Sequence, residues 1–252
     1  MAQNVAHAEL AALTRGYPFS VAAGACALWA AQYALARAAL QRQSSVFANR
    51  LVSIVHALVA MAMCTLALPR GSLRTELGRV GSRSSPAEEA AIAISLGYFV
   101  YDTACCLSIG EREAANNVHH VVSIAGLAAG LFSHRCAAEL VLALLLVEVS
   151  NPFLHVRSLL AELNLKSSLL YTLSEAGFLI AYTLGRMVLG PLLVYHTLQS
   201  PLPPPAIKVG AVGLQLVSVF WFREILAKAS NKLGLHRARS KQRRGSKNSK
   251  SR

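Results

Sequence analysis

The chain has 252 residues, of which 54% are hydrophobic and only 15% are charged, and its mean hydropathy is +0.43. Soluble domains usually carry about a quarter charged residues, so this composition excludes an ordinary soluble domain and predicts a membrane protein. The net charge of +13 is concentrated in the stretch REILAKASNKLGLHRARSKQRRGSKNSKSR, which holds 11 of the 25 basic residues. Because the charge belongs to one segment, we expect no nucleic-acid partner.

Seven apolar stretches follow one another, each close to the ~20 residues that cross ~30 Å of hydrocarbon as a helix. They occupy residues 17–40, 47–68, 90–109, 117–134, 136–156, 168–198 and 205–227. The sixth is long, and Gly190-Pro191 predicts a bend within it. The predicted fold class is therefore all-α, a polytopic transmembrane helical bundle with about seven membrane-spanning helices.

Basic residues between the stretches predict the orientation. With seven helices and a cytosolic tail, the N-terminus lies across the membrane, and six basic residues share the side of the tail. These are Arg37, Arg42, Arg50, Arg112, Arg157 and Lys166. The loop PRGSLRTELGRVGSRSSPAEE opposes this orientation, because its four arginines would be luminal. An even helix count would reverse half of the assignments.

The two ends of the chain carry further predictions. The first apolar stretch begins after 16 mostly polar or small residues without a clear basic segment, so we expect a retained anchor and no cleaved signal peptide. The basic tail, interspersed with Gly and Ser, cannot bury a core, which predicts disorder. Near a membrane surface it would contact anionic cytosolic headgroups, at about 1 kcal/mol per basic residue.

The five cysteines lie inside or at the edges of apolar stretches and are Cys26, Cys64, Cys105, Cys106 and Cys136. Their spacing lacks the CxxC pattern of a zinc site and the density of a small secreted scaffold. We interpret them as reduced, small hydrophobic side chains. A lipidation or redox role for Cys105-Cys106 beside Asp102 is a weaker alternative to inert packing.

Ionisable residues inside the stretches are the candidates for function, because a charge near mid-bilayer costs about 2.5–3.5 kcal/mol on insertion scales. They are His56, Asp102, His119, His120, Glu148, Glu175 and Arg186. All but Arg186 lie about two to nine residues from the predicted cytosolic ends of their helices. Groups at similar depth on neighbouring helices can share a polar cavity. We therefore predict one cavity that opens to the cytosol, with His119, His120, Asp102 and Glu148 lining it, and His56 and Glu175 near its wall.

The adjacent histidines point about 100° apart on a helix, so one can face the cavity while the other supports it or meets the headgroups. Imidazole is the usual general base near neutral pH, which makes His119 and His120, with Glu148 and Asp102, the candidate catalytic residues. An i, i+1 pair cannot easily present both rings to one ion, and the sequence has no HExxH motif. We expect neither a metal nor a cofactor.

The candidates for substrate binding are His56, Glu175, Arg186 and Asn151. His56 also fits a hydrogen bond between helices with no further role. Glu175 and Arg186 are 11 residues apart, which places them on one helix face but about 16 Å apart, so they cannot pair directly. Arg186 can instead snorkel or meet an acid on another helix.

Four segments, taken in order, resemble the TLC domain, the multipass fold shared by ceramide synthases, translocon-associated TRAM proteins and ceroid-lipofuscinosis-related proteins. They are NRLVSIVHALVA, YFVYDT, NNVHHVVSIAGL and ELVLALLLVEVSNPFLHVRSLL. The resemblance divides the chain into an N-terminal segment with the first transmembrane helix (1–44), a TLC-like transmembrane domain (45–230) and a basic, disordered cytosolic tail (231–252). The form ExSNPFLHxR is similar to the small TLC domain-containing proteins, among them a protein 5-like branch.

Ceramide synthases carry paired histidines followed, after one turn back through the membrane, by an H-D-x-x-D element. His119 and His120 match the pair, but the corresponding stretch reads Glu148-Val149-Ser150-Asn151-Pro152-Phe153, with one carboxylate in place of two aspartates. This departure argues against acyl-CoA-dependent N-acylation and leaves another use of the same cavity open.

The resemblance implies a protein of the endoplasmic reticulum that binds lipid and takes part in membrane lipid homeostasis, without favouring an enzyme. The alternative is an acyl-CoA-dependent N-acyltransferase, in which a histidine deprotonates a sphingoid amine and Glu148 orients or stabilises it. A weaker alternative, from family analogy alone, is a cargo escort in the early secretory pathway. The expected partners are membrane lipids, acyl-CoA in the alternative, and anionic headgroups at the tail.

Overall fold

The computed structural model describes the backbone of residues 2–68 and 73–249 and the side chains of residues 17–68, 73–231 and 234. The helices in this part of the chain are α1 (Ala2–Ala39), α2 (Ser45–Ala67), α3 (Leu73–Leu77), α4 (Pro86–Ser108), α5 (Ala114–Ser133), α6 (Ala137–Glu148), α7 (Asn151–Glu162), α8 (Leu169–Tyr182), a π-helical segment (Thr183–Leu189), α9 (Gly190–Gln199) and α10 (Pro205–Ser249). Nearly all side chains of the predicted tail, 231–252, lie outside the described residues, so its disorder and its lipid contacts stay predictions.

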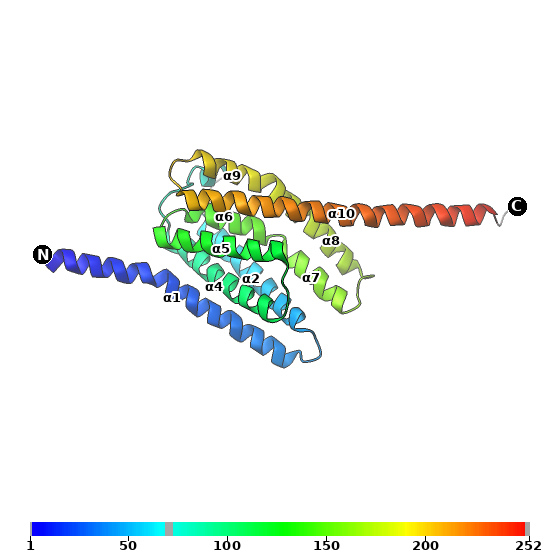
Figure 1. Ribbon diagram of the computed structural model, residues 1–252, viewed down its shortest axis with the longest axis horizontal. Coiled ribbons are helices and arrows are strands. Elements are labelled where there is room, and N and C mark those ends of the chain that lie inside the picture. Colours follow the sequence, from blue (N-terminus) through cyan, green and yellow to red (C-terminus); the bar gives the residue numbers. More distant parts are fainter. Residues whose placement is uncertain (1, 69–72, 250–252) are drawn as a thin grey trace.

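Six described helices are long and apolar enough to cross a membrane, which confirms the all-α polytopic fold class. They are Tyr17–Ala39, Ser45–Ala67, Pro86–Ser108, Ala137–Glu162, Leu169–Gln199 and Pro205–Asn231. The predicted stretch at 117–134 corresponds to α5, which has 20 residues but carries two asparagines and two histidines in its first half and falls short of the same criterion. α5 nevertheless packs between α4 and α10 (Figure 1).

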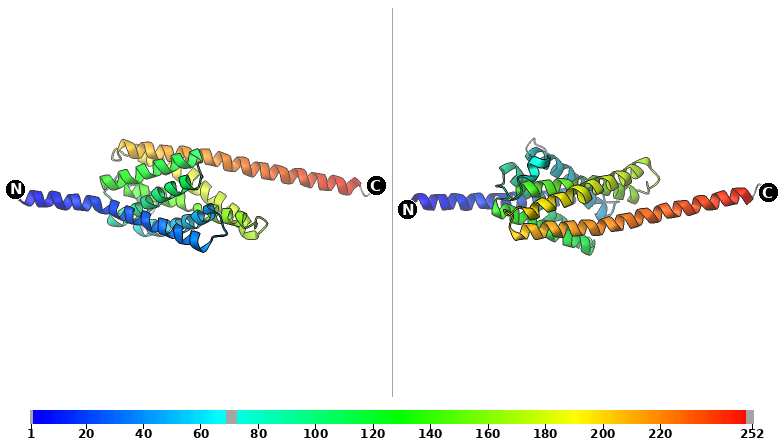
Figure 2. Two further views of the ribbon diagram at one scale, coloured as in Figure 1. Left: turned by 60° about the horizontal axis from the view of Figure 1, so that its bottom comes forward. Right: turned by 90° about the horizontal axis from the view of Figure 1, so that it is seen from above.

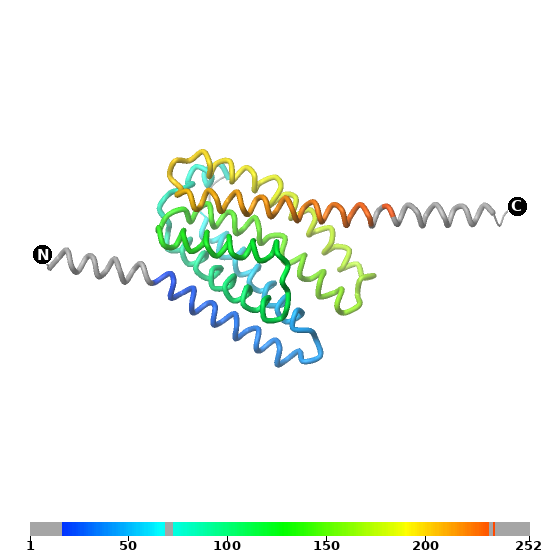
Figure 3. The backbone as a smooth tube through the Cα atoms, viewed as in Figure 1, coloured from blue at the N-terminus to red at the C-terminus, as the bar shows by residue number. Residues whose placement is uncertain are grey.

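Consecutive long helices run antiparallel, so their connections gather at two ends of the bundle (Figure 1; Figure 3). We call these the α1–α2 end, with the loops at 40–44, 109–113 and 163–168, and the α5–α6 end, with the loops at 78–85, 134–136 and 200–204. α1 lies at one edge of the bundle, against α4, whereas α10 lies against α5 and α9 (Figure 2). The long C-terminal part of α10 extends beyond the α1–α2 end.

Local sequence signals account for several helix boundaries. Ser44 caps α2 by accepting a hydrogen bond from the backbone N–H of Phe47, and Ser85 forms a capping box with Glu88 before Pro86 begins α4. The predicted stretch at 136–156 contains an interruption at Val149-Ser150, after which Asn151-Pro152 begins α7. Pro152 lacks the backbone N–H that a continuous helix needs, which suits it to the first turn of α7.

The predicted bend in the sixth stretch takes the form of the π-helical segment that directly precedes Gly190-Pro191. Gly185 lies within this segment, and a Cβ there would overlap the carbonyl oxygen of Leu146. The glycine therefore allows the segment to approach the backbone of α6 closely. This approach positions the neighbouring Arg186 against the end of α6.

Buried acids attach the loop before α4 to the rest of the bundle. Both carboxylate oxygens of Glu139 accept hydrogen bonds from the backbone N–H of Gly81, at 3.0 and 3.1 Å. Gly81 has φ +80°, and a Cβ there would overlap Leu202, so this position requires glycine. Arg79 donates to Glu76 at 2.9 Å and to Glu88 at 2.7 Å.

These contacts hold Arg79 in its charged form. Burial by itself would lower the pKa of Arg79, but its hydrogen bonds to Glu88 and Glu76 outweigh this and raise the pKa above the ordinary value. The charge of Arg79 is therefore balanced by two buried carboxylates. The positive-inside rule counts basic residues and not net charge, so the four arginines still oppose the predicted orientation. The orientation itself stays a prediction.

Replacing Gly97 should separate α1 from α4. A Cβ at Gly97 would overlap the backbone of Ala22 and lie 2.8 Å from the backbone nitrogen of Cys26, whereas a Cβ at Gly24 on α1 would meet nothing within 4 Å. We expect Gly97→Ala to cost about 1–3 kcal/mol through overpacking and Gly24→Ala to leave stability unchanged. Thermal unfolding of the detergent-solubilised proteins measures the difference. Equal midpoints for the two variants would contradict the close α1–α4 contact.

Candidate functional site

A cavity of about 980 Å³ lies among α2, α4, α5, α7, α8 and α10. At the α1–α2 end its lining includes charged residues from several helices and loops: Arg50, Glu111, Arg112, Glu113 and Lys228. Deeper in the bundle it is lined by the candidates Asp102, His119, His120, Glu148, Asn151 and Arg186. We call this the polar cavity. Because its charged rim belongs to the α1–α2 end, the predicted orientation would open it to the cytosol.

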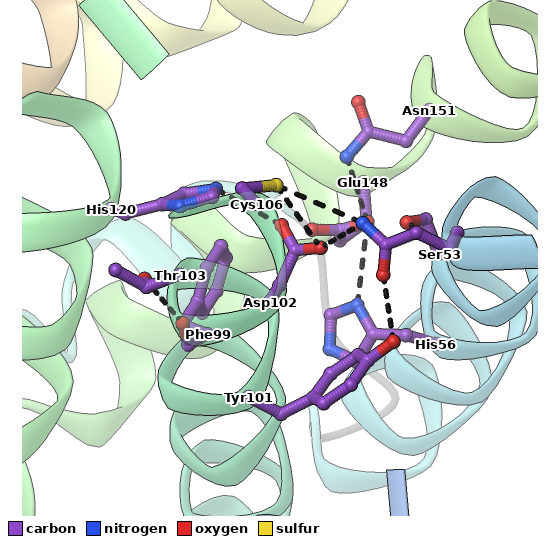
Figure 4. A network of polar contacts seen from close by, with 11 residues as sticks. Ser53, His56, Phe99, Tyr101, Asp102, Thr103, Cys106, His120, Glu148 and Asn151 are labelled. Atoms are coloured by element: carbon purple, nitrogen blue, oxygen red, sulfur yellow. Dashed lines mark hydrogen bonds and ion pairs between the residues drawn. The ribbon is translucent and has the colours of Figure 1, made fainter. Parts of the chain in front are cut away.

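Asp102 on α4 is the centre of a hydrogen-bonded cluster (Figure 4). Its Oδ1 accepts a hydrogen bond from Nδ2 of Asn49 on α2 at 2.8 Å, and its Oδ2 lies 3.2 Å from Nε2 of His120 on α5. Tyr101 donates to Oδ1 of Asn49 at 2.7 Å, which fixes the orientation of that amide. The structure thus brings the predicted residues His120 and Asp102 into direct contact and adds Asn49 to them.

Glu148, at the end of α6, is 2% exposed and belongs to a second cluster. Its Oε2 accepts a hydrogen bond from Nδ2 of Asn151 at 2.9 Å, while Nδ1 of His56 lies 3.9 Å away, beyond hydrogen-bonding distance. His56 instead stacks on Tyr98, with ring centroids 3.6 Å apart and an interplanar angle of 4°. This stacking places His56 behind the cavity wall, away from any cavity ligand.

Arg186 lies in the π-helical segment and contacts the second cluster from the other side. Its Nη2 donates to the backbone oxygen of Val147 at 3.2 Å and to Oδ1 of Asn151 at 3.4 Å. The amide of Asn151 therefore bridges Glu148 and Arg186. The guanidinium also lies over the rings of Tyr182 and Trp221, at 4.9 and 5.9 Å from their centroids.

Glu175 lies apart from both clusters. It is a partly exposed residue of the cavity wall, and its Oε1 is 4.0 Å from Nη1 of Arg157. Glu175 therefore lies beside an arginine on α7, whereas Arg186 contacts residues of α6, α7, α8 and α10. The two residues do not pair directly, as their spacing predicted.

Both histidines of the pair are buried, at 8% exposure for His119 and 4% for His120. The sequence predicted that one ring would face the cavity while the other supported it or met the headgroups. α10 covers the His119 side of α5 and brings Trp221 to 5.3 Å between ring centroids, so His119 lies inside the bundle. His119 lines the cavity next to Phe99, while His120 reaches Asp102.

Sequence reasoning missed several residues that line the cavity, above all Asn49, Tyr98, His155 and Trp221. Helical spacing offered a signal for two of them. Asn49 precedes the candidate His56 by seven residues, and His155 follows Glu148 by seven, a spacing that usually repeats a helix face. No comparable signal marks Trp221, because only the packing of α10 against α5 brings it to the site.

A second, smaller cavity of about 110 Å³ lies between α5, α6, α9 and α10. Its lining is mostly apolar and includes Val122, Leu140, Leu144, Leu193, Ile207 and Leu214. We call it the apolar cavity. Phe99, His119 and Arg186 line both cavities, so the two adjoin across these side chains.

The fold and this site define the class of protein. Six apolar helices enclose a polar interior, as in an integral membrane protein. The family model of the TLC domain matches residues 46–227, and the chain therefore belongs to the TLC domain family. This confirms the resemblance found in the sequence.

Curated relatives match a shorter part of the chain. TLC domain-containing protein 1 of Homo sapiens is 31% identical over 144 residues, which cover 55% of this chain and 56% of the human protein. The Mus musculus protein of the same name is 32% identical over 142 residues, again 55% of this chain and 56% of the relative. The chain thus spans about half the length of these relatives. Neither bears on the predicted protein 5-like branch, and no solved structure matches the chain significantly.

The bridge through Asn151 should stabilise the fold. Removing its amide by Asn151→Ala leaves the buried Glu148 without its 2.9 Å donor and Arg186 without one acceptor. We expect a loss of about 1–3 kcal/mol, a fall in Tm of about 2–4 °C per kcal/mol. Asn116→Ala, at the cavity lining but outside both clusters, is the matched control. If thermal unfolding shows equal losses for the two variants, the bridge contributes nothing specific.

Proposed function

We propose that this TLC-domain protein binds a membrane lipid in the two joined cavities and thereby takes part in membrane lipid homeostasis. One observation carries the proposal: a large polar cavity with a charged rim meets an apolar cavity at Phe99, His119 and Arg186. A site with one polar and one apolar compartment matches an amphipathic ligand. The head of the lipid would occupy the polar cavity and its chain the apolar one.

The dimensions of the apolar cavity suit a lipid chain. Its lining on α10 extends from Ile207 to Ser218. The eleven steps between these two residues correspond to about 16 Å at 1.5 Å per residue, roughly half of the ~30 Å hydrocarbon core. One acyl chain covers this depth in a leaflet. In this proposal the chain lies toward the α5–α6 end and the head toward the α1–α2 end.

The membrane in question is that of the endoplasmic reticulum, a proposal that rests on family resemblance alone. The six apolar helices require a membrane without distinguishing one from another. Membrane lipids are then the partners of the protein, and they reach the cavity from the bilayer that surrounds it.

Filling the apolar cavity should remove the bound lipid. Gly126 lines this cavity, and a Cβ there would meet nothing within 4 Å, so Gly126→Leu can occupy the space without a backbone clash. Gly24→Leu adds the same side chain on α1, away from the cavity, and is the control. We expect wild type and Gly24→Leu to copurify with lipid and Gly126→Leu to lose most of it, as measured by native mass spectrometry. Wild-type protein free of lipid, or equal lipid in all three, would refute the proposal.

A second candidate function, N-acyl transfer, is favoured by the contact between His120 and Asp102. A carboxylate 3.2 Å from Nε2 can orient an imidazole as a general base. His120 would take a proton from an amine as its nitrogen attacks an acyl-thioester, so that a C–N bond forms, the C–S bond breaks and the thiolate leaves with the proton. Against this, Asn151 follows Glu148 at the spacing of the two aspartates of the synthase element and supplies an amide instead.

Asp102→Asn separates the two functions. The substitution preserves the shape of the side chain but removes the carboxylate that supports His120, so a transferase should lose about 10²–10⁴-fold of its activity. We expect purified wild type to form no N-acyl product from acyl-CoA and a sphingoid amine, and Asp102→Asn to restore the lipid composition of cells that lack the protein. The opposite pair of results, product formation by wild type and failed rescue by the variant, would favour the transferase.

A further inference from the structure

Arg186 is a buried cation whose hydrogen-bonding capacity is only partly used. Its side chain is 5% exposed. Nη2 has acceptors in Val147 and Asn151, but within the part of the chain that the structure describes, Nε and Nη1 have no hydrogen-bond partner. Buried polar atoms are nearly always satisfied, so two unpartnered donors on one side chain indicate a missing acceptor.

The charge of Arg186 also lacks a direct counterion. A guanidinium stays protonated in proteins and is costly to bury without an anion. Among the described side chains, no carboxylate lies within the 4 Å of an ion pair with Arg186, which contacts a carbonyl, an amide and two aromatic rings. Glu148 acts on the charge of Arg186 only across the amide of Asn151, without direct contact. Asp102 is bound by Asn49 and His120.

The location of Arg186 connects this unsatisfied charge to the lipid site. The residue lines both cavities, at the place where the polar one meets the apolar one. An anionic group beside Arg186 would therefore be continuous with a chain in the apolar cavity. That cavity is the smaller and the more apolar of the two.

We propose that Arg186 is an anion-binding residue and that the ligand of the two adjoining cavities is a lipid with an anionic head, a carboxylate or a phosphate. This inference rests on the proposed lipid binding and adds the chemistry of the head. The head accepts hydrogen bonds from the free nitrogens of Arg186, with His119 and Trp221 beside it. The polar cavity connects the head to water at the α1–α2 end.

Equilibrium binding to the purified full-length chain tests the inference with probes that share one chain and differ in the head. The probes are oleate, oleoyl lysophosphatidate and oleyl alcohol, with acetate as a free anion without a chain. Charge-assisted hydrogen bonds are about twice as strong as neutral ones, so we expect both anionic lipids to bind about tenfold or more tightly than the alcohol. Acetate should not displace oleate at millimolar concentration.

Variants then assign the preference to Arg186. Arg186→Gln should abolish the preference for anionic heads while retaining the affinity for oleyl alcohol, which also shows that the variant is folded. Arg186→Lys keeps a charge and should keep part of the preference. Arg74→Gln removes an exposed arginine that lines neither cavity and is the matched control, with the preference unchanged.

The outcomes distinguish this inference from the function on which it rests. Equal affinity of wild type for oleate and oleyl alcohol, or a preference that survives in Arg186→Gln, would overturn the anionic head but not lipid binding. If acetate displaces oleate as effectively as unlabelled oleate does, the ligand of Arg186 is a free anion and not a lipid. If none of the lipid probes binds, the proposed lipid site fails as a whole.

Discussion

Hydrogen bonding of the buried Asp102 carboxylate is the interaction on which the arrangement of the bundle depends. An isolated carboxylate inside lipid is too costly to persist, so α4 must pack where neighbouring helices supply partners. α2 supplies Asn49 at 2.8 Å and α5 supplies His120 at 3.2 Å. α5 itself has a polar first half that lipid would not tolerate. Its position between α4 and α10 buries the histidines against Asp102 and Trp221 and makes the short, polar helix part of the bundle.

The cluster around Glu148 also surrounds a buried carboxylate with polar partners, but here an amide lies between the two charged groups. Glu148 and Arg186 carry opposite charges, yet Asn151 lies between them and bonds to both. The interruption before α7 places Asn151 there, and the close approach of Gly185 to α6 brings Arg186 within reach of the Val147 carbonyl. The guanidinium of Arg186 is therefore held in position, while its Nε and Nη1 have no hydrogen-bond partner among the described residues.

The sequence predicted which segments form helices, but it did not predict which helices pack against one another. Runs of about 20 apolar residues determine transmembrane helices from composition alone, and the long helices at 45–67 and 86–108 lie close to the predicted stretches. The polar first half of α5 shows the limit of that reasoning, since only its neighbours explain why it is buried. The surroundings of His119 have the same origin. Its contact with Trp221 depends on the packing of α10, which begins more than 80 residues later in the sequence.

The sequence by itself determined that the protein is a helical membrane bundle of the TLC type and that its polar side chains converge. The reason is energetic: lipid penalises each isolated polar group, so their presence inside apolar stretches implies common burial. Only the tertiary structure decided which groups meet. In the structure His120 contacts Asp102, His56 stacks on Tyr98 behind the cavity wall, and Arg186 lines both cavities. Helix rotation and crossing set these contacts, and both arise from side-chain packing between segments far apart in the chain.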